Sequence, residues 1–535
     1  MHTSLKVFLR SALAGAGLLA FASAQAQVAA PMPDVNGVID NTPDSILQAR
    51  MARPVAGSSR NGNRPVLFTV GNSTMRTGTK GNGNNGQWGW GYFFPDFFDK
   101  DSVTVENHAL GGMSTRTFYT RLWPDVLKGV QAGDYVMIEL GHNDNGPYDS
   151  GRARATIPGI GTDSLCVTIA ETGEKETVYT YGEYLRRYIN QVKAKGAYPI
   201  LLSLTPRKAW DEAGRVVRVD KTFGLWARQV AEAEDVPFID LNEISASKYD
   251  TFGPDKVEYM FYLDRIHTSQ FGAVENARSA AEGLRQLDIP LARWLKPEPA
   301  QIERKTSLPA IFLIGDSTVK NKDADPDDMW GWGAVLAEQF DSTKVEIINC
   351  AKAGRSARTF LDEGRWDEVY RSLRPGDMVI MQFGPTDGGD IHTGKARGEL
   401  HGAGPESKVF LMEPTGRYQV IYTYGWYLRK FIGDAHEKGA TAVVVSHTPR
   451  NKWDAEGRIE SNADSYGLWS RQAAAQMGAP WIDLNGATGA KLQALGPEAA
   501  AEYFKKDHTH SSLKGARLNA STLASLLPPA FQRLR

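Results

Sequence analysis

Short apolar runs alternate with longer amphipathic stretches along most of the chain. Several runs are apolar at nearly every position, which is typical of strands buried on both faces of a sheet. Helical patterns, such as those over 182–195 and 425–438, stand between them. This alternation predicts a parallel sheet between two layers of helices. The predicted strands are 65–70, 103–107, 135–140, 199–204 and 237–241 in the first half of the chain, and 310–314, 345–349, 378–383, 442–446 and 480–484 in the second.

The second half of the chain repeats the first at a constant offset of 243 residues. A repeat of about 240 residues is too long for a solenoid unit and indicates a duplicated domain. We therefore expect copy one over 64–295, a linker over 296–307 and copy two over 308–535. The recurring stretches are 178–189 with 421–432, 205–207 with 448–450, 223–229 with 466–472, and 238–242 with 481–485.

The first 26 residues have the pattern of a secretion signal. Lys6 and Arg10 precede an apolar run over 12–22, and Ala24-Gln25-Ala26 supplies a small-x-small cleavage pattern. The run is too short to span a bilayer, which takes about 20 residues, and no later stretch qualifies. We expect cleavage near Ala26, a secreted or periplasmic protein without membrane attachment, and an N-terminal arm over 27–63.

Charge and cysteine content narrow the function. The 535 residues include 61 Lys and Arg against 62 Asp and Glu. A nucleic-acid-binding protein would need an excess of basic residues, so we expect no such partner. Cys166 and Cys350 lie in different halves at non-equivalent positions, and we expect two buried free thiols. Their spacing is not that of a zinc site.

In copy one, candidate chemistry stands directly after the predicted strands, where such sheets bind ligands. Ser73 follows the first strand at a turn into a helix, although a plain N-cap serine is the alternative. Gly112 follows the second strand and permits close backbone approach. Asn143 follows the third and can aim an amide N–H at an oxyanion. Asp264 precedes His267 by three residues, so its carboxylate can orient an imidazole that takes a proton from serine.

Copy two repeats this order with one change. Ser317, Gly354, Asp507 and His510 take the corresponding places, and the serine–histidine separation is 193 residues against 194 in copy one. After the third strand, however, Thr386 stands where copy one has asparagine, so the amide donor is missing. Because a lost oxyanion donor costs about 10²–10³ in rate in other enzymes, we expect copy one to be the main catalyst.

Together these blocks resemble the SGNH (GDSL-type) hydrolases, and more narrowly the rhamnogalacturonan acetylesterases. The resemblance covers nearly the whole chain after the signal. It implies two tandem three-layer α/β/α domains of flavodoxin-like type, each with a five-stranded parallel sheet. The motifs that carry it are Gly-x-Ser-Thr, Trp-Gly-Trp-Gly at 88–91 and 330–333, Asn-x-Ala-x-x-Gly, Thr-Pro-Arg and Asp-x-x-His.

The resemblance also implies roles in copy one: Ser73 as nucleophile, His267 as base and Asp264 as its orienting acid. The oxyanion hole would consist of the Ser73 N–H, the Gly112 N–H and the Asn143 amide. In copy two the implied site residues are Ser317, Asp507, His510 and Gly354, with Thr386 in the asparagine place. Copy one departs from the family at Asn72, where an aspartate is usual.

Five further residues are candidates for substrate binding. Trp88 and Trp90 follow the nucleophile turn and can stack on sugar rings, or instead pack between the turn and the sheet. Arg207 and Arg450 follow the fourth strand and can meet a galacturonate carboxylate, with a structural salt bridge as the alternative. Trp210 has the same two interpretations as the other tryptophans.

The sequence therefore predicts a secreted serine esterase that removes O-acetyl groups from plant cell-wall polysaccharide, with pectin or rhamnogalacturonan as the expected substrate. It would use an acyl-enzyme mechanism, mainly in copy one, with acetylated poly- or oligosaccharide as partner and no metal or organic cofactor. Two alternatives stay open. One is a lipolytic or aryl esterase on the same fold. The other is a carbohydrate-binding protein with degenerate hydrolase domains, most plausible for copy two.

Overall fold

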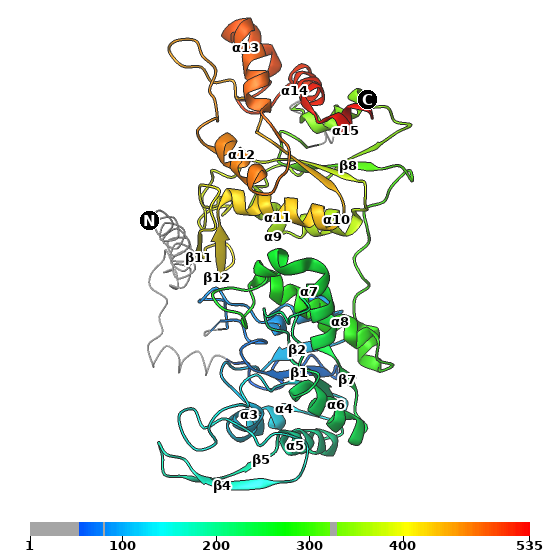
Figure 1. Ribbon diagram of the computed structural model, residues 1–535, viewed down its shortest axis with the longest axis vertical. Helices are drawn as coiled ribbons and strands as arrows, with labels where there is room; N and C mark the ends of the chain where they lie inside the picture. Colours follow the sequence, from blue (N-terminus) through cyan, green and yellow to red (C-terminus); the bar gives the residue numbers. More distant parts are fainter. Residues whose placement is uncertain (1–52, 79–80, 321–328) are drawn as a thin grey trace, which may run out of the picture. The chain divides into compact units, whose positions relative to one another are not determined.

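The computed structural model describes residues 53–78, 81–320 and 329–535. The chain divides into two compact units between Lys296 and Pro297, coloured blue to green and green to red in Figure 1. Unit 1 contains copy one and unit 2 contains copy two. The predicted signal peptide and most of the predicted N-terminal arm lie outside the described residues.

A parallel sheet forms the centre of unit 1. In the described part of this unit its order is β2-β1-β3-β6-β7, and every neighbouring pair is parallel. The apolar runs predicted all five strands, although the last is only two residues long. The strands are β1 (Val66–Gly71), β2 (Thr104–Asn107), β3 (Tyr135–Glu139), β6 (Tyr198–Leu202) and β7 (Phe238–Ile239).

Helices cover both faces of this sheet (Figure 1). Val66, Phe68 and Val70 of β1 point to a core shared with α3, α4, α5 and α6. Leu67 points to the opposite core, which α8 completes. This alternation gives the three-layer arrangement that the sequence predicted. The helices are α3 (Thr115–Arg121), α4 (Trp123–Gly129), α5 (Tyr181–Ala194), α6 (Phe223–Ala233), α7 (Leu241–Glu258) and α8 (Gln270–Arg285), with short 3₁₀ turns η1 (Trp90–Tyr92), η2 (Phe94–Phe97) and η3 (Pro290–Trp294).

Unit 2 has the same sheet, in the order β9-β8-β10-β13-β14 among its described residues, again wholly parallel. The fold class predicted from the sequence, two tandem α/β domains with five-stranded parallel sheets, is confirmed. The strands are β8 (Ala310–Gly315), β9 (Glu346–Asn349), β10 (Met378–Gln382), β13 (Thr441–Val445) and β14 (Trp481–Ile482). The helices are α9 (Ala357–Asp362), α10 (Arg365–Ser372), α11 (Tyr424–Glu437), α12 (Tyr466–Gln476), α13 (Leu484–Ala500), α14 (Leu513–Leu526) and α15 (Pro529–Gln532), with η4 (Trp332–Ala334), η5 (Leu336–Gln339) and η6 (Ala501–Tyr503).

Each unit also has a two-stranded antiparallel hairpin that the sequence analysis did not predict. In unit 1 it joins β4 (Ser164–Thr168) to β5 (Lys175–Tyr179), and in unit 2 β11 (Ser407–Met412) to β12 (Arg417–Tyr422). The hairpins stand between the third and fourth sheet strands. The hairpin strands contain a mixture of polar and apolar residues, unlike the apolar sheet strands. In unit 1 this fits the environment of β4, much of which is exposed to solvent.

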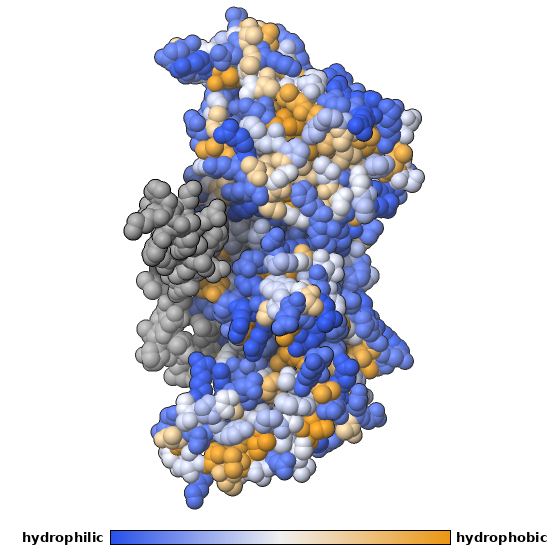
Figure 2. All heavy atoms as spheres, in the orientation of Figure 1, coloured by the Kyte–Doolittle hydropathy of each residue, from blue (hydrophilic) through white to orange (hydrophobic). Residues whose placement is uncertain are grey.

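The surface offers no obvious apolar face in the view of Figure 2, which is mainly hydrophilic with small separate hydrophobic patches. Within the described ranges, no helix is both long and apolar enough to cross a membrane. Cys166 and Cys350 are both free thiols. Burial was predicted for both, but Cys166 is exposed because it lies on the solvent-facing hairpin strand β4, while Cys350 is partly buried.

Candidate active sites

The end of β1 turns sharply and presents Ser73 at the carboxyl edge of the sheet. The Asn72 side-chain oxygen accepts the Thr74 backbone N–H at 3.0 Å and so fixes the turn around Ser73. Ser73 itself is half-buried, whereas Asn72 and Thr74 are buried. The turn after β8 is built in the same way. Asp316 and Thr318 flank Ser317, and the Asp316 side-chain oxygen accepts the Thr318 backbone N–H at 2.8 Å.

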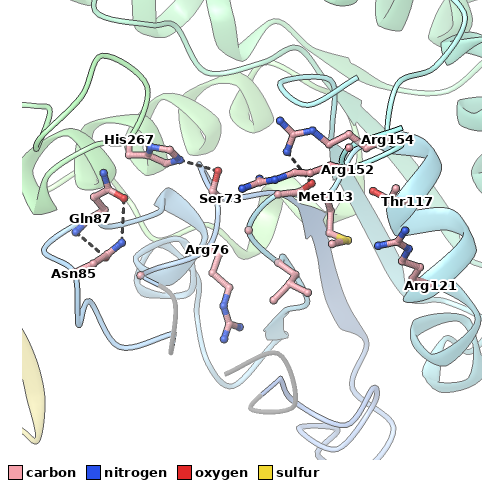
Figure 3. A pocket seen from close by; sticks show the side chains of 15 residues that line it. Ser73, Arg76, Asn85, Gln87, Met113, Thr117, Arg121, Arg152, Arg154 and His267 are labelled. Atoms are coloured by element: carbon pink, nitrogen blue, oxygen red, sulfur yellow. Dashed lines mark hydrogen bonds between the residues drawn. The ribbon is translucent and has the colours of Figure 1, made fainter. Parts of the chain in front are cut away.

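In unit 1 the loop before α8 brings His267 to Ser73. The His267 Nε2 atom lies 2.9 Å from the Ser73 Oγ atom, and its Nδ1 lies 2.7 Å from Asp264 Oδ2 (Figure 3). Asp264 Oδ1 accepts two backbone N–H groups, from Ile266 and His267, each at 2.7 Å. Burial alone would raise the pKa of Asp264, but these hydrogen bonds lower it to about 2. The carboxylate is therefore ionised and fixed against the imidazole.

Unit 2 has the same array. His510 Nε2 lies 2.8 Å from Ser317 Oγ, and His510 Nδ1 lies 2.7 Å from Asp507 Oδ2. Burial again opposes ionisation of Asp507, and hydrogen bonds from His510 and Thr509 lower its pKa to about 2. The structure thus brings together the three residues that the spacing singled out in each copy.

Glycine turns lie beside both serines. Gly112 has φ of 78° and Gly354 has φ of 71°, a left-handed conformation that favours glycine. A Cβ atom built on Gly111 would lie 3.7 Å from the Ser73 Cβ, so this turn is directly against the serine. Asn143 Nδ2 donates to the Met113 carbonyl at 3.0 Å. Since an amide group has two N–H donors, this bond fixes the Asn143 side chain and leaves a second donor.

The four predicted substrate-binding residues of unit 1 do not line the cavity at Ser73. Trp88 is 4% exposed and Trp90 is fully buried, so neither offers a ring face to a sugar. Trp90 packs in the core on one face of the sheet, and Trp88 packs against the rings of Tyr92 and Phe93, which corrects the stacking interpretation. The reason is that the segment 88–91 folds back under the turn, where the Trp90 N–H donates to the Thr74 carbonyl at 3.1 Å. Arg207 and Trp210 are half-buried outside the lining of this cavity.

The cavity beside Ser73 and His267 has a volume of about 510 Å³ and a strongly basic lining. Arg76, Arg121, Arg152 and Arg154 line it, and no carboxylate does among the described residues. Figure 3 places Arg152 and Arg154 on one side of Ser73 and His267 on the other.

Burial and neighbouring positive charges lower the pKa of two of these arginines. Burial, and next the charge of Arg53, lower the pKa of Arg76 to about 10. Burial and then Arg152 lower the pKa of Arg154. In the described part of the chain, Arg121 and Arg152 form no ion pair. These guanidinium groups were missed from the sequence. The comparison of copies contained a signal, since Lys395 and Arg397 repeat the basic character of 152 and 154.

Copy two differs around its serine. Glu363 takes the place of Arg121 and pairs with Arg355 at 2.9 Å and Arg365 at 2.7 Å, so these charges are compensated locally. A cavity of about 380 Å³ in unit 2 is lined by Thr386 and Arg450, but Ser317 and His510 are not part of its lining. Within the described ranges, no group of three or more His, Cys, Asp or Glu side chains is arranged to hold a metal ion.

Comparison with known proteins identifies one family and several relatives. The profile of the GDSL-like lipase/acylhydrolase family matches the chain twice, over residues 69–273 and 313–518. A rhamnogalacturonan acetylesterase of Emericella nidulans is 31% identical over 210 residues, which cover 39% of this chain and 81% of that protein. A rhamnogalacturonan acetylesterase of Bacillus subtilis is 30% identical over 228 residues, covering 40% and 87%. Among solved structures, the protein YxiM of Bacillus subtilis is 27% identical with a TM-score of 0.35, covering 43% of this chain and 58% of that one.

Two parallel-sheet domains, each with serine, histidine and aspartate in hydrogen-bond contact at the strand ends, define a class of enzyme: the chain is a carboxylic ester hydrolase. It belongs to the GDSL-like lipase/acylhydrolase family, of which it carries two tandem copies.

Proposed function

We propose that the protein is an exported acetylesterase that removes O-acetyl groups from an acidic cell-wall polysaccharide, such as acetylated rhamnogalacturonan or another pectin, with unit 1 as the main catalyst. The observation that carries this proposal is the arginine-lined cavity beside Ser73. The names of the curated relatives support the same substrate class. Export rests on the signal pattern of the first 26 residues.

The electrostatics of the cavity favour an anionic polymer. Pectin carries a carboxylate on each galacturonate, and guanidinium groups bind carboxylates through paired N–H donors. Burial, and next the charge of Arg152, lower the pKa of Arg154, and a bound carboxylate would offset both effects. A neutral acetylated polymer such as xylan would leave these charges without a partner. The cavity therefore predicts selectivity by charge as well as by the acetyl group.

Acyl transfer at this site proceeds through a covalent intermediate. Ser73 Oγ attacks the acetyl carbonyl carbon while His267 Nε2 takes its proton. The oxyanion that forms is held by the Ser73 and Gly112 N–H groups and the Asn143 amide. The sugar oxygen leaves with the proton from His267. Water, deprotonated by His267, then attacks the acetyl-enzyme and releases acetate and free Ser73.

Unit 1 is the better candidate for two reasons. Its oxyanion hole has Asn143, where unit 2 has Thr386. Its cavity also offers Arg121, where unit 2 has Glu363 paired with arginines. Unit 2 keeps its serine, histidine and aspartate in contact, so we expect weak hydrolysis there and not a pure binding role.

Acetate release from acetylated pectin and acetylated xylan tests the proposal. The proteins are the parent, Ser73→Ala and Ser317→Ala, each checked for folding by circular dichroism. We expect faster release from pectin, near-complete loss in Ser73→Ala and little loss in Ser317→Ala. A preference for xylan would contradict the acidic substrate, and loss that follows Ser317 would reverse the roles of the two units. Edman sequencing of the exported protein tests cleavage near Ala26.

The cavity arginines provide a second, independent arm. Arg121→Ala combined with Arg152→Ala is expected to raise KM for pectin about a hundredfold or more, because each lost charge-assisted pair is worth about 1.5–3 kcal/mol. Hydrolysis of a neutral nitrophenyl acetate is expected to change little. Equal loss on both substrates would show that the arginines support the fold and not the polymer.

A further inference from the structure

Beneath the nucleophile turn, the two copies carry the same pair of chemical groups in exchanged positions. Copy one has an amide at Asn72 and a carboxyl at Glu139. Copy two has a carboxyl at Asp316 and an amide at Gln382. The sheet register makes the positions equivalent, because Gly71 pairs with Glu139 in unit 1 and Gly315 pairs with Gln382 in unit 2. All four side chains are fully buried.

In copy two these groups form a hydrogen-bond chain with a fixed direction. The Trp332 indole N–H donates to Gln382 Oε1 at 2.8 Å. The Gln382 amide N–H donates to the hydroxyl of Thr318, the residue that follows Ser317 in the chain, as Asp316 precedes it. The Thr318 hydroxyl proton then donates to Asp316 Oδ1 at 2.7 Å. Each of these contacts has one donor and one acceptor.

Copy one has an equivalent series of contacts, but an ionised Glu139 would lack the proton that the Gln382 amide donates in copy two. Trp90 donates to Glu139 Oε2 at 3.3 Å. The Thr74 Oγ atom lies 3.0 Å from Glu139 Oε2 and also 3.0 Å from Asn72 Oδ1. A single hydroxyl proton cannot serve two acceptors. If Glu139 is protonated, it donates to Thr74 and Thr74 donates to Asn72, which reproduces the direction of copy two.

Burial of Glu139 favours that protonated form, and the His142 Nε2 atom lies 3.5 Å from Glu139 Oε1. Burial raises its pKa to about 7, against opposing hydrogen bonds from Trp90, Thr74 and the Thr205 N–H. The carboxyl of Asp316 has a pKa raised to about 7 by burial in the same way. Each copy therefore keeps a single carboxyl with a raised pKa in this chain, at opposite ends.

The chain acts on the nucleophile through its two neighbours in sequence. Asn72 and Thr74 flank Ser73, and Asn72 Oδ1 also accepts the Thr74 backbone N–H. Thr74 is held from the other side by the Trp90 backbone N–H. The orientation of the Ser73 N–H and Oγ atom depends on this turn.

We propose that Glu139 is a positioning residue for Ser73, and that Asn72–Glu139 in copy one and Asp316–Gln382 in copy two are equivalent pairs. Each pair consists of one proton donor to the threonine hydroxyl and one oxygen that accepts from that hydroxyl. The inference rests on the proposed role of Ser73 as nucleophile. It accounts for the departure of copy one from its family at Asn72, because the Asn72 side-chain oxygen accepts from the threonine as a carboxylate oxygen does.

Paired substitutions at position 139 test this in a Ser317→Ala background. Glu139→Gln keeps a donor to the Thr74 hydroxyl, whereas Glu139→Met has a similar size and removes both the donor and the acceptor. We expect Glu139→Met to lower kcat for nitrophenyl acetate about tenfold or more, with KM nearly unchanged, because the polymer-binding arginines lie elsewhere. Glu139→Gln is expected to stay within about threefold of the parent, and so is the double exchange Asn72→Asp with Glu139→Gln, which gives copy one the pair of copy two.

The exposed carboxyl of Glu212 offers a control of the same chemistry, since Glu212→Gln is expected to leave the rate unchanged. Midpoints of thermal unfolding give a readout that needs no activity, with a lowered midpoint in Glu139→Met and no lowering in Glu139→Gln. If Glu139→Met does not fold, Glu139→Gln and the double exchange decide, and a large loss of kcat in either one contradicts the proposal. A folded Glu139→Met variant as active as the parent, or an equal loss in Glu139→Gln and Glu139→Met, would overturn it. A parent without esterase activity would instead contradict the proposed function.

Discussion

Asp264 accepts four hydrogen bonds, and its replacement by asparagine is a sharp test of the site. Oδ1 accepts the Ile266 and His267 backbone N–H groups, and Oδ2 accepts His267 Nδ1 and the Gln87 amide at 3.1 Å. Asparagine has one oxygen, so in Asp264→Asn two donors must face its NH₂ group. The backbone donors cannot turn away, whereas the imidazole can change its tautomer. We therefore expect the His267 proton to move to Nε2, where it faces Ser73 Oγ and prevents proton transfer from the serine.

The magnitude follows from the bonds that are lost. Two hydrogen bonds to a charged acceptor are worth about 1.5–3 kcal/mol each. Their sum of about 3–6 kcal/mol corresponds to about 10²–10⁴ in rate, at about 1.4 kcal/mol for each factor of ten. Gln87→Leu removes only the more distant donor, so we expect a loss of about fivefold, in line with one modest hydrogen bond.

The assay is kcat and KM for nitrophenyl acetate in a Ser317→Ala background, with circular dichroism as the check on folding. Asp211→Asn is the control, because Asp211 also accepts backbone N–H groups, from Ala213 and Arg215, in an exposed turn away from Ser73. It is expected to have full activity. A folded Asp264→Asn enzyme within tenfold of the parent would refute the reasoning.

Three further predictions concern the oxyanion hole and the buried carboxyl. In a Ser73→Ala background, Thr386→Asn is expected to raise ester hydrolysis by copy two about 10²-fold, as one oxyanion donor is worth in other enzymes; no gain would show that another feature limits copy two. Gly112→Ala forces a side chain into φ of 78°, with its Cβ 3.4 Å from an Arg152 guanidinium nitrogen. At about 1–2 kcal/mol for that conformation, we expect kcat about tenfold lower, and an unchanged kcat would argue against a role of this turn. Because burial raises the pKa of Glu139 from its ordinary value of 4.5 to about 7, the folded protein holds a proton that the unfolded chain releases, so stability falls as pH rises between these values. Glu139→Gln is expected to remove the contribution of Glu139 to this decline, about 3 kcal/mol for the unfolding of unit 1, in unfolding curves recorded from pH 4 to 8, while the contribution of Asp316 in unit 2 stays; an identical decline in the variant would assign it elsewhere.

Much of the fold was predictable because its signals are local or periodic. Strands such as β3 and β10 are apolar at nearly every position, since both of their faces are covered by helices. Because the domain is duplicated, each element could be assigned in both copies. The constant offset then related the strand ends of one copy to those of the other. The hairpins β4–β5 and β11–β12 were missed because their residues are mixed in polarity and one strand faces solvent.

The sequence by itself also determined which residues form the serine–histidine–aspartate arrays. Ser73 follows the first strand and His267 lies in the loop before α8, and the spacing of the motifs together with the family resemblance predicted their roles. What these residues face was decided only by the tertiary structure. Trp88 and Trp90 look like sugar-stacking residues in sequence, but the chain folds them under the turn.

The arginine cavity and the buried carboxyl–amide pair belong wholly to the tertiary structure. Arg76 follows β1, Arg121 ends α3 and Arg152 lies in a loop after β3, and only their packing around Ser73 gathers their charges. Glu139 is the last residue of a buried strand, and nothing in the periodicity shows that Asn72 on the neighbouring strand end shares its hydrogen bonds. Local pattern determines which element a residue belongs to, whereas electrostatics and hydrogen bonding depend on distances between elements, which folding alone sets.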